Sequence, residues 1–316
     1  MKIVVTGASG LAGYHAARAC LARGLEVHAF YHTNEPLLPG AQLHQVDLSD
    51  IGHLDAPILS LFPDVIIHAA AVSSPADVDA NPERAEKLNV ALPRRLAQLA
   101  HHLGSRLIHL STDMVFDGQD APYRSTDLPN PVGLYGQLKL LAEREVLEHG
   151  VDEATVMRIT ILTGDSPSGQ RAVHEKLFHA LMRGERPKLF TDEIRQPLSA
   201  VNLGEALAEL CERPNLHGIF HWAGNETISR YEMAAKILKH FGLSEDLIEA
   251  AECADTGRPA DLRFELQPLM GKLKTAPLSF DNQLAHMTVP AACRAWYAET
   301  TGRNPAPTRL RKGIDF

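Results

Sequence analysis

A tyrosine and a lysine one helical turn apart could together donate a proton to a carbonyl oxygen. Tyr135 and Lys139 lie in the stretch 134–149, whose periodicity predicts a helix, and residues four apart share one helix face. A free tyrosine has a pKa of about 10, and a nearby ammonium favours the phenolate and lowers that pKa. Such a pair can protonate a carbonyl oxygen while a hydride reaches the carbon. The spacing also arises by chance on solvated helix surfaces.

Two further polar residues could serve the same chemistry. Thr112 follows the predicted strand 107–110, and ligands bind at the carboxyl ends of the strands in an open α/β sheet. Its hydroxyl could hydrogen-bond the substrate oxygen, or it could be an ordinary turn or helix-cap residue. Asn89, midway along the predicted helix 82–103, could hold a water that connects Lys139 to solvent. A plain position on the helix surface is the alternative.

A glycine-rich turn near the amino terminus is typical of a dinucleotide-binding loop. Gly7, Gly10 and Gly13 follow a predicted strand and open a predicted helix, which is the setting that this motif needs. The glycines allow a tight turn, close backbone approach to a pyrophosphate and close helix packing. Ser9 and Leu11 belong to the same turn, at a helix amino terminus that attracts phosphate. A plain glycine turn is the alternative.

Residues at the ends of the next strands could contact the rest of the dinucleotide. We expect the adenine beside the end of strand 43–46 and the cofactor backbone beside the end of strand 65–68, with strand-end packing as the alternative. No Asp or Glu sits at the end of strand 26–30 to hold the ribose of NAD, so the sequence slightly favours NADPH and leaves NADH open. The residues expected to line the cofactor here are Asp47, Leu48, Ala69, Ala70, Ala71 and, near a 2′-phosphate, His32.

Short apolar runs alternate with helical patterns along the first part of the chain. This alternation predicts an α/β fold, a Rossmann-type doubly wound parallel sheet covered by helices on both faces. Gly24 and Gly150 stand where the helices 11–23 and 134–149 should end. Leu141 and Leu147 should face the core. About seven strands are expected, at 3–5, 26–30, 43–46, 65–68, 107–110, 155–159 and 219–222.

The pattern changes after about residue 165, which indicates a second, smaller lobe. Residues 166–195 and 225–316 have the pattern of helices and loops, whereas 196–224 contain a helix and a strand that return to the main sheet. We therefore predict a dinucleotide-binding domain over 1–165, completed by about 196–224, and a substrate-binding lobe formed by the two other segments. The cleft between them is the natural substrate site.

Composition limits the setting in which this chemistry would take place. The chain is 45% hydrophobic and has a formal net charge of −8, which argues against nucleic acid as the main partner. It begins with a strand rather than a signal peptide and lacks an apolar run of about 20 residues. We therefore expect a cytoplasmic protein that does not span a membrane. Four scattered cysteines and 16 histidines without a ligand-like spacing favour neither a metal nor a redox site.

Several strings resemble one family of enzymes. The chain resembles the extended short-chain dehydrogenase/reductases, and more narrowly the dTDP-4-dehydrorhamnose reductase branch, in TGASGLAG at 6–13, STDMVFDG at 111–118 and YGQLKLLAE at 135–143. It is also similar, more weakly, in MRIT at 157–160, FTDEIRQPLSAVN at 190–202 and GIFHWAGNETISRYEMA at 218–234. The resemblance implies reduction of a keto group on a nucleotide-linked deoxy sugar, with NADPH or NADH.

Carried over by position, the resemblance implies roles for single residues. Tyr135 would be the proton donor, and Lys139 would lower its pKa and bind the nicotinamide ribose. Thr112 would orient the keto oxygen. Asp113 would help to shape the sugar site, and Arg258 would contact the nucleotide diphosphate, unless it is a surface cation.

Two positions depart from the family pattern. Met114 stands where the family usually has an aromatic residue, and Ile161 stands where it usually has a tryptophan. Both family aromatics lie against the sugar, whereas Met and Ile supply apolar area without a phenol or indole donor. The resemblance therefore implies intact hydride chemistry and an altered sugar pocket, which Met114 and Ile161 line.

The resemblance leaves other functions open. It extends to the regulatory subunit of methionine adenosyltransferase, a partner subunit with a similar fold and dinucleotide loop. Epimerases and dehydratases of sugar nucleotides also use this fold. Tyr135, Lys139 and Thr112 together favour a reductase, because a regulator has less need of all three. Some family members bind magnesium through glutamates at a dimer contact, but the sequence identifies no such ligands here and leaves a homodimer open.

Overall fold

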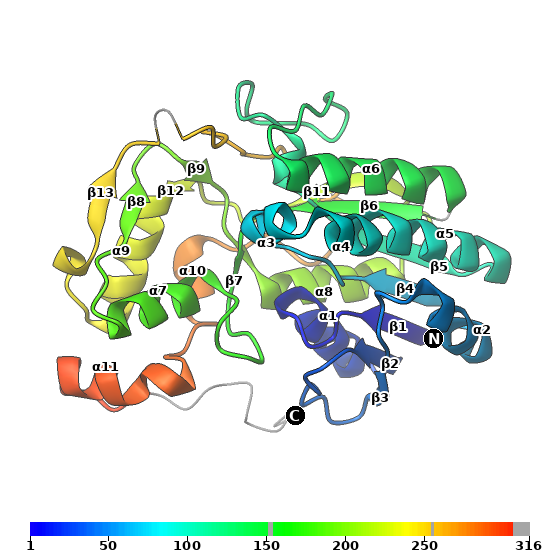
Figure 1. Cartoon of the computed structure of the whole chain (residues 1–316), viewed down its shortest axis with the longest axis horizontal. Helices are drawn as coiled ribbons and strands as arrows, with labels where there is room; N and C mark the ends of the chain where they lie inside the picture. Colours follow the sequence, from blue (N-terminus) through cyan, green and yellow to red (C-terminus); the bar gives the residue numbers. More distant parts are fainter. Residues whose placement is uncertain (151–153, 254–255, 306–316) are drawn as a thin grey trace.

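The computed structural model describes residues 1–150, 154–253 and 256–305. Its elements form two groups, which we call the sheet lobe and the small lobe (Figure 1). The sheet lobe contains the seven-stranded sheet with its helices, and the small lobe contains short strand pairs and the helices α7, α9, α10 and α11. The predicted domain boundaries at about 165, 196 and 224 stay a prediction. Within the predicted second lobe, residues 254–255 and 306–316 lie outside the described residues.

The central sheet is parallel throughout and contains the seven strands that the sequence predicts. The strand order is β11-β6-β5-β4-β1-β2-β3, so the chain starts in the middle, runs out to one edge and then crosses to the other side. This reversal places a topological switch point between β1 and β4, where open α/β sheets bind ligands. The strands are β1 (Lys2–Thr6), β2 (Glu26–Tyr31), β3 (Gln42–Gln45), β4 (Val65–His68), β5 (Arg106–Thr112), β6 (Ala154–Ile159) and β11 (Gly218–Trp222).

Helices cover both faces of this sheet. Alternate residues of β1 show why: Ile3 and Val5 pack toward α1 and α8, whereas Val4 packs into the other core, toward α5 and α6. Both faces of the strand are therefore buried, as a doubly covered parallel sheet requires. The helices are α1 (Leu11–Ala22), α2 (Asp55–Leu61), α3 (Pro75–Ala80), α4 (Pro82–Glu86), α5 (Leu92–Leu103), α6 (Leu134–His149) and α8 (Ala200–Cys211).

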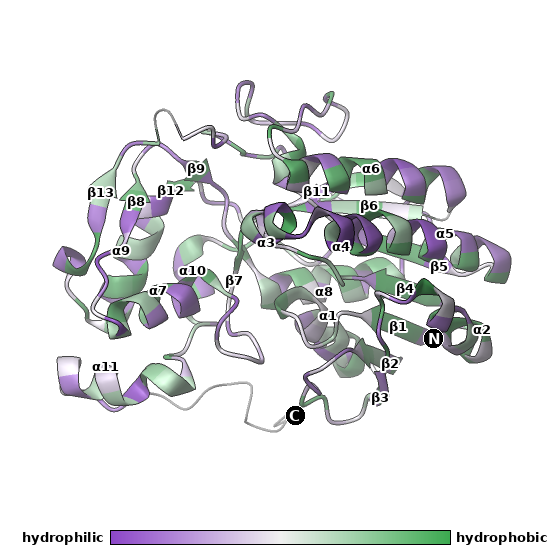
Figure 2. Cartoon of the chain, viewed as in Figure 1, coloured by the Kyte–Doolittle hydropathy of each residue, from purple (hydrophilic) through white to green (hydrophobic). Residues whose placement is uncertain are grey.

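The hydropathy of the elements agrees with this layering. In Figure 2 the hydrophobic colour runs along much of the central sheet, and the short helix α4 is hydrophilic. Among the described residues, no helix combines the length and the apolar character that a bilayer span would need.

The predicted ends of the first helix and of helix 134–149 are confirmed, whereas the predicted helix 82–103 is divided into three parts. Helix α1 is followed by Gly24 with a φ of +71°, a left-handed position that suits glycine after a helix. Gly150 caps α6 with an ordinary right-handed backbone. The predicted helix 82–103 comprises α4, a π turn over Lys87–Ala91 and α5. A π turn inserts one extra residue per turn and re-aims the side chains that it carries.

The small lobe has its own apolar core. Phe178, Ile237 and Phe280 are buried there and come from α7, α9 and α10. Helix α9 begins at a capping box formed by Ser229 and Glu232, which satisfies backbone donors at its first turn. The elements are α7 (Val173–Met182), α9 (Arg230–Phe241), α10 (Phe280–Leu284), α11 (Arg294–Thr301), β8 (Lys188–Phe190) paired with β13 (Glu249–Ala251), β9 (Ile194–Arg195) paired with β12 (Ile228–Ser229), and β7 (Leu162–Thr163) paired with β10 (Leu198–Ser199).

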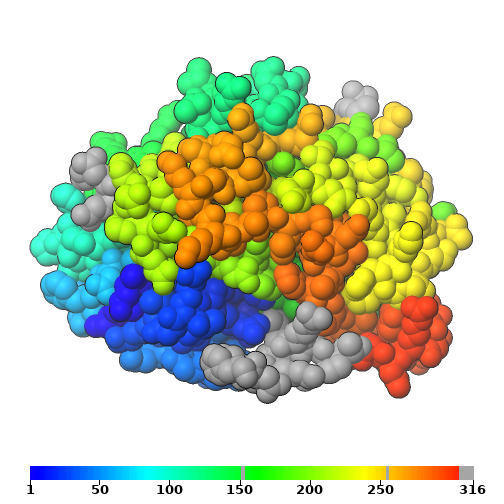
Figure 3. Space-filling view, turned by 180° about the vertical axis from the view of Figure 1, so that it is seen from behind, coloured from blue at the N-terminus to red at the C-terminus, as the bar shows by residue number. Residues whose placement is uncertain are grey.

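The segment that follows β13 joins the two lobes from behind. Figure 3 shows it in orange across the middle of the back face. Leu269 and Leu273 enter the core of the sheet lobe. Glu209 of α8 accepts hydrogen bonds from the backbone of Lys274 at 2.7 Å and of Thr275 at 2.9 Å. These contacts attach the segment to the sheet lobe before it enters the small lobe at α10.

Candidate active site

The glycine turn links β1 to α1 and is built for close backbone approach. Gly7 has a φ of +69°, and a Cβ there would lie 2.8 Å from the backbone of Ala70 at the end of β4. A Cβ on Gly13 would collide with the carbonyl oxygen of Gly7. Gly10 caps α1 and donates its N–H to the Gly7 oxygen at 2.8 Å. The turn therefore fits the glycine cradle in which a dinucleotide pyrophosphate faces a helix amino terminus.

The other residues predicted for this part of the cofactor lie around the same turn. Ser9 is partly buried in the turn itself. Leu11 packs with Ala172 and Ala200 near the small lobe, so only its backbone could serve a phosphate. Ala69, Ala70 and Ala71 follow β4, and the N–H of Ala70 donates to Thr6 at 3.3 Å.

The residues predicted for the adenosine end come together at the edge of β2 and β3. The Nε2 atom of His32 lies 3.6 Å from a carboxylate oxygen of Asp47, and both side chains are at least half exposed. Leu48 is buried in the sheet-lobe core, so its side chain faces away from solvent. The sequence places no acid directly at the end of β2, yet the register of β3 brings the Asp47 carboxylate beside His32. The ribose region therefore contains both an acid and an imidazole.

The first turn of α6 packs tightly on the loop after β5. A Cβ on Gly136 would collide with the carbonyl oxygen of Met114, so glycine allows the helix to approach this loop. The contact positions Tyr135 near Thr112 and Asp113, whose hydrogen bond and charge act on its phenol. Met114 packs partly buried into the cluster around Phe116.

Lys139 is buried and hydrogen-bonded at the end of β5. Its Nζ donates to the carbonyl oxygen of Leu110 at 2.6 Å and to Nε2 of His109 at 3.0 Å. Because an ammonium only donates, Nε2 of His109 must accept and its proton must lie on Nδ1. Burial lowers the pKa of Lys139 to about 8, although the charge of Glu143 opposes this. Burial and the Lys139 cation hold the pKa of His109 well below its usual range.

The phenol of Tyr135 is a weaker acid than the sequence suggests. Burial raises its pKa to about 12, the negative charge of Asp113 adds to this, and a hydrogen bond with Thr112 acts in the opposite direction. The expected lowering of this pKa by Lys139 is therefore not found. The physical reason is that desolvation outweighs the other effects, while the ammonium is directed to Leu110 and His109.

Thr112 and Asp113 end β5 and share a hydrogen bond. The Thr112 hydroxyl donates to the Asp113 carboxylate at 3.0 Å and accepts the N–H of Met114 at 3.2 Å. Burial raises the pKa of Asp113 to about 6, against the opposing charge of Arg195. Thr112 thus has the capping role that the sequence left as one alternative, and it ends β5 beside Tyr135. Its hydrogen bond to a substrate oxygen stays a prediction.

Asn89 lies at the middle of the π turn, where its amide holds the backbone of another segment. Its Oδ1 accepts the N–H of Val72 at 2.8 Å, and its Nδ2 donates to the Val72 oxygen at 3.0 Å. Asn89 therefore fixes the backbone beyond β4, next to the alanines predicted to line the cofactor. Its role in a water chain to Lys139 stays a prediction.

The structure adds a group of charged residues that the sequence did not single out. Glu193 and Arg195 are buried beside Arg258. Both lie in the stretch 190–202 that carries the family resemblance, but the resemblance gave neither residue a role. Arg195 donates to Glu193 at 2.9 Å, and the half-exposed Arg258 donates to the same oxygen at 2.8 Å. Arg230, the first residue of α9, lies within the field of these groups and of Asp113. Ile161, predicted to line the sugar pocket, packs partly buried against the small-lobe core.

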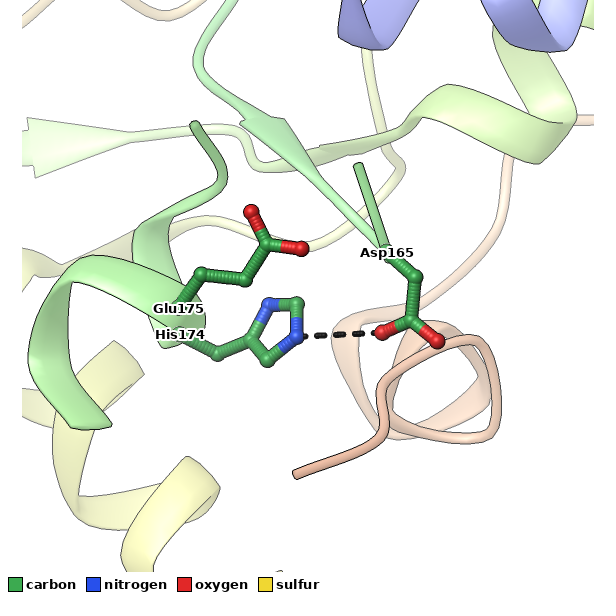
Figure 4. A group of neighbouring side chains, drawn as sticks. All are labelled: Asp165, His174 and Glu175. Carbon is green, nitrogen blue, oxygen red and sulfur yellow. Dashed lines mark hydrogen bonds and ion pairs between the residues drawn. The ribbon is translucent and has the colours of Figure 1, made fainter. Parts of the chain in front are cut away.

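Three other side chains offer metal-ligand atoms close together, but their oxygens are already used. Asp165, His174 and Glu175 have such atoms within 4.8 Å of one another, and Figure 4 shows the His174 ring directed at Asp165. The Asp165 carboxylate accepts the N–H and the hydroxyl of Thr288, each at 2.7 Å. Glu175 accepts the N–H of Ser166 at 2.7 Å. We interpret this group as a hydrogen-bonded junction of loops.

The chain is similar to proteins of one family over most of its length. A model of the family described as RmlD substrate binding domain matches residues 1–288. The beta subunit of methionine adenosyltransferase 2 from Bos taurus is 32% identical over 248 residues, which cover 77% of this chain and 72% of that protein. A probable low-salt glycan biosynthesis reductase from Haloferax volcanii is 32% identical over 263 residues, covering 82% and 87%.

A solved structure has the same fold. The crystal structure of a hypothetical dTDP-4-dehydrorhamnose reductase from Sulfolobus tokodaii superposes with a TM-score of 0.76 at 30% identity. The superposition covers 89% of this chain and 98% of that one. The predicted Rossmann-type architecture and the predicted family resemblance are both confirmed.

Proposed function

The chain belongs to the RmlD substrate binding domain family, and on that premise we propose that it is an NAD(P)H-dependent reductase of a keto group on a nucleotide-linked deoxy sugar. The observation that carries the proposal is the meeting of Tyr135 with Thr112 at the carboxyl edge of the sheet. The glycine turn after β1 lies at the same edge, because β1, β4 and β5 are parallel neighbours. Hydride donor and proton donor would thus converge on one carbonyl.

The cofactor fits the residues present, since the turn has the glycine backbone and the following helix amino terminus that a dinucleotide pyrophosphate needs. A bound NADPH or NADH supplies the hydride to the carbonyl carbon. Tyr135 holds its proton firmly at neutral pH and releases it only as negative charge develops on the carbonyl oxygen. Thr112 orients that oxygen, and Lys139 would bind the nicotinamide ribose, the role that the family resemblance implies for it. The product is the alcohol, and the phenol is restored by a proton from solvent.

The preference between NADPH and NADH depends on the edge of β2 and β3. NADPH remains slightly favoured on the sequence argument, with His32 beside the 2′-phosphate. The Asp47 carboxylate beside His32 opposes this preference, because it would repel a phosphate and could accept the ribose hydroxyls of NAD. Measured Michaelis constants for the two cofactors would decide between them.

One screen tests the proposed reaction. Purified protein is mixed with NADPH or NADH and with each member of a panel of 4-keto sugar nucleotides and small ketones, and the nicotinamide absorbance is followed. We expect absorbance to fall only with keto sugar nucleotides. Stable absorbance across the whole panel would contradict the proposal. Tyr135→Phe serves as the inactive control.

A second candidate function comes from the beta subunits of methionine adenosyltransferase 2 to which the chain is similar. On this alternative the chain would bind a catalytic subunit and use its dinucleotide loop for regulation. Binding to a methionine adenosyltransferase, with a change in its activity and no keto reduction, would favour this candidate. A tightly held NAD in the spectrum of the purified protein would instead favour an epimerase or dehydratase. The cytoplasmic location and a homodimer stay predictions.

A further inference from the structure

The guanidinium of Arg230 has one buried nitrogen whose donor is unused. Its Nη1 atom is buried and bonds to no residue in the described part of the chain. Buried polar atoms in native proteins nearly always have a partner, because leaving one unpaired forfeits its hydration. An unpaired arginine nitrogen next to a candidate active site therefore points to a missing anionic acceptor.

Short strands bring Arg230 to this place. Strand β12 pairs antiparallel with β9, which aligns Ile228 with Arg195. The N–H of Arg230 then donates to the backbone oxygen of Glu193 at 3.1 Å. The segment around Asp261 bridges to Ile194 from the other side, so three separate stretches of the chain meet at one point.

The other acids nearby do not satisfy Arg230. The buried Glu193 already accepts from Arg195 at 2.9 Å and from Arg258 at 2.8 Å through a single oxygen. Asp113 accepts from Thr112 at 3.0 Å. Among the described residues whose charges act on one another here, Arg195, Arg230 and Arg258 face Glu193 and Asp113, an excess of one positive charge. A group with one negative charge matches this excess better than a diphosphate does.

The site faces the reacting end of the substrate rather than the nucleotide end. The charge of Asp113 acts on both Tyr135 and Arg230, so Asp113 lies near both. Arg258, which was predicted to contact the diphosphate, is half exposed, whereas Nη1 of Arg230 is buried. A sugar whose keto group meets Tyr135 would thus bring its neighbouring substituents toward Arg230.

We propose that Arg230 binds a carboxylate on the sugar ring, so that the keto deoxy sugar of the proposed function carries an acid group, as sugars of the uronate class do. The keto group of this substrate rests on the proposed reductase function. The carboxylate contact can be tested without turnover. Arginine is suited to this contact, because its planar fork matches the two oxygens of a carboxylate. Met114 and Ile161, which replace the family aromatics, are consistent with a pocket altered for a different sugar.

The test compares two ligands that differ only in the carboxylate. UDP-glucuronate and UDP-glucose are titrated calorimetrically into the full chain in the presence of NADP⁺. We expect UDP-glucuronate to bind about ten-fold more tightly, and we expect Arg230→Gln to remove this difference while NADP⁺ affinity is unchanged. Arg144→Gln, at an exposed position of α6, is the matched control and should retain the preference.

Each other outcome has a defined meaning. Equal affinities for the two ligands in the wild-type chain, or no binding of UDP-glucuronate, would overturn the proposal. An equal loss for both ligands in Arg230→Gln would also overturn it, since the contact would then be to the shared diphosphate. Arg230→Lys, which keeps the charge, should retain part of the preference and guards against misfolding of Arg230→Gln. A preserved preference without keto reduction would refute the proposed function and leave the carboxylate site standing.

Discussion

At the scale of single residues, Tyr135 is set up to keep its proton until the reaction needs it. Burial and the Asp113 carboxylate both oppose the phenolate, which raises the pKa of Tyr135 to about 12. An acid of this kind donates well to an oxygen that is becoming an alkoxide, since such an oxygen is more basic still. The structure thus favours Tyr135 as a general acid in the reductive direction.

Removing the phenolic hydroxyl tests this assignment. We expect Tyr135→Phe to lower turnover by roughly 100-fold or more, the usual loss for general acid catalysis, with the affinity for NADP(H) nearly unchanged. Steady-state kinetics and cofactor titration measure the two quantities separately. Undiminished turnover would remove Tyr135 from the chemistry.

Lys139 should give the reaction an alkaline limit. Burial lowers the pKa of Lys139 to about 8, so its cation is present below this pH and is lost above it. We therefore expect the turnover number to fall as pH rises through about 8. In Lys139→Arg the cation persists to much higher pH. We expect this variant to be slower than the wild type, but its turnover number should not fall as pH rises through about 8. An identical alkaline limb in that variant would assign the limb to another group.

At the scale of elements, the turn between β1 and α1 depends on glycines for two different reasons. Gly10 faces the expected pyrophosphate from the helix cap, whereas Gly13 allows α1 to pack against the turn itself. A side chain at each position should thus have a different consequence.

The two glycines can be separated by substitution. We expect Gly10→Val to weaken NADP(H) binding by about ten-fold, or 1.4 kcal/mol, with a small effect on folding. Gly13→Ala should lower the free energy of unfolding by about 1–3 kcal/mol, because its Cβ would collide with the Gly7 oxygen. Gly133→Ala is the control, since a Cβ there meets no atom within 4 Å. Calorimetry and urea unfolding distinguish the effects.

The buried face of helix α6 differs from the predicted one at one residue. Leu138, Ala142 and Val146 turn inward, whereas Leu141 is 38% exposed, and Leu147 packs at the margin of the core. The prediction that Leu141 faces the core is therefore wrong. The reason is rotational: the helix must direct Tyr135 and Lys139 at the cleft, and this sets which other positions face inward.

The corrected helix face makes a stability prediction. We expect Val146→Ala to lower the free energy of unfolding by about 2 kcal/mol, because two buried methyl groups are lost and a cavity remains. Leu141→Ala should change it by less than about 0.5 kcal/mol. Urea unfolding of the two variants is the measurement. Similar losses in both would mean that Leu141 is buried in solution.

At the scale of the whole molecule, buried neutral histidines should make the fold sensitive to acid. Burial lowers the pKa of His15 to about 4 and those of His68 and His221 to about 3, from an ordinary value of 6.5. Below pH 6.5 these three histidines therefore bind protons in the unfolded chain but stay neutral in the folded chain. Their stabilising effect is fully present above pH 6.5 and is lost as pH falls through the folded-state values.

Urea unfolding at a series of pH values tests this sensitivity. We expect the free energy of unfolding to decline between pH 6.5 and about 4, with each such histidine contributing about 1.4 kcal/mol per pH unit. His15→Gln should make the decline less steep by one such contribution. The exposed His101→Gln should not alter the slope. An unchanged slope in His15→Gln would show that His15 is protonated in the folded chain.

The sequence by itself determined what depends on neighbours along the chain. The order of strands and helices, the glycine turn and the one-turn spacing of Tyr135 and Lys139 follow from local periodicity and backbone geometry. These features are confirmed in the sheet order and in the bounds of β1, α1 and α6.

Only the tertiary structure decided which charges meet. The register of β3 brings Asp47 to His32, burial rather than Lys139 sets the acidity of Tyr135, and the pairing of β9 with β12 brings Arg195 and Arg230 together. None of these contacts has a periodic signature, because the partners lie on separate strands and loops. Electrostatic energies depend on separation and burial, and both are properties of the folded chain.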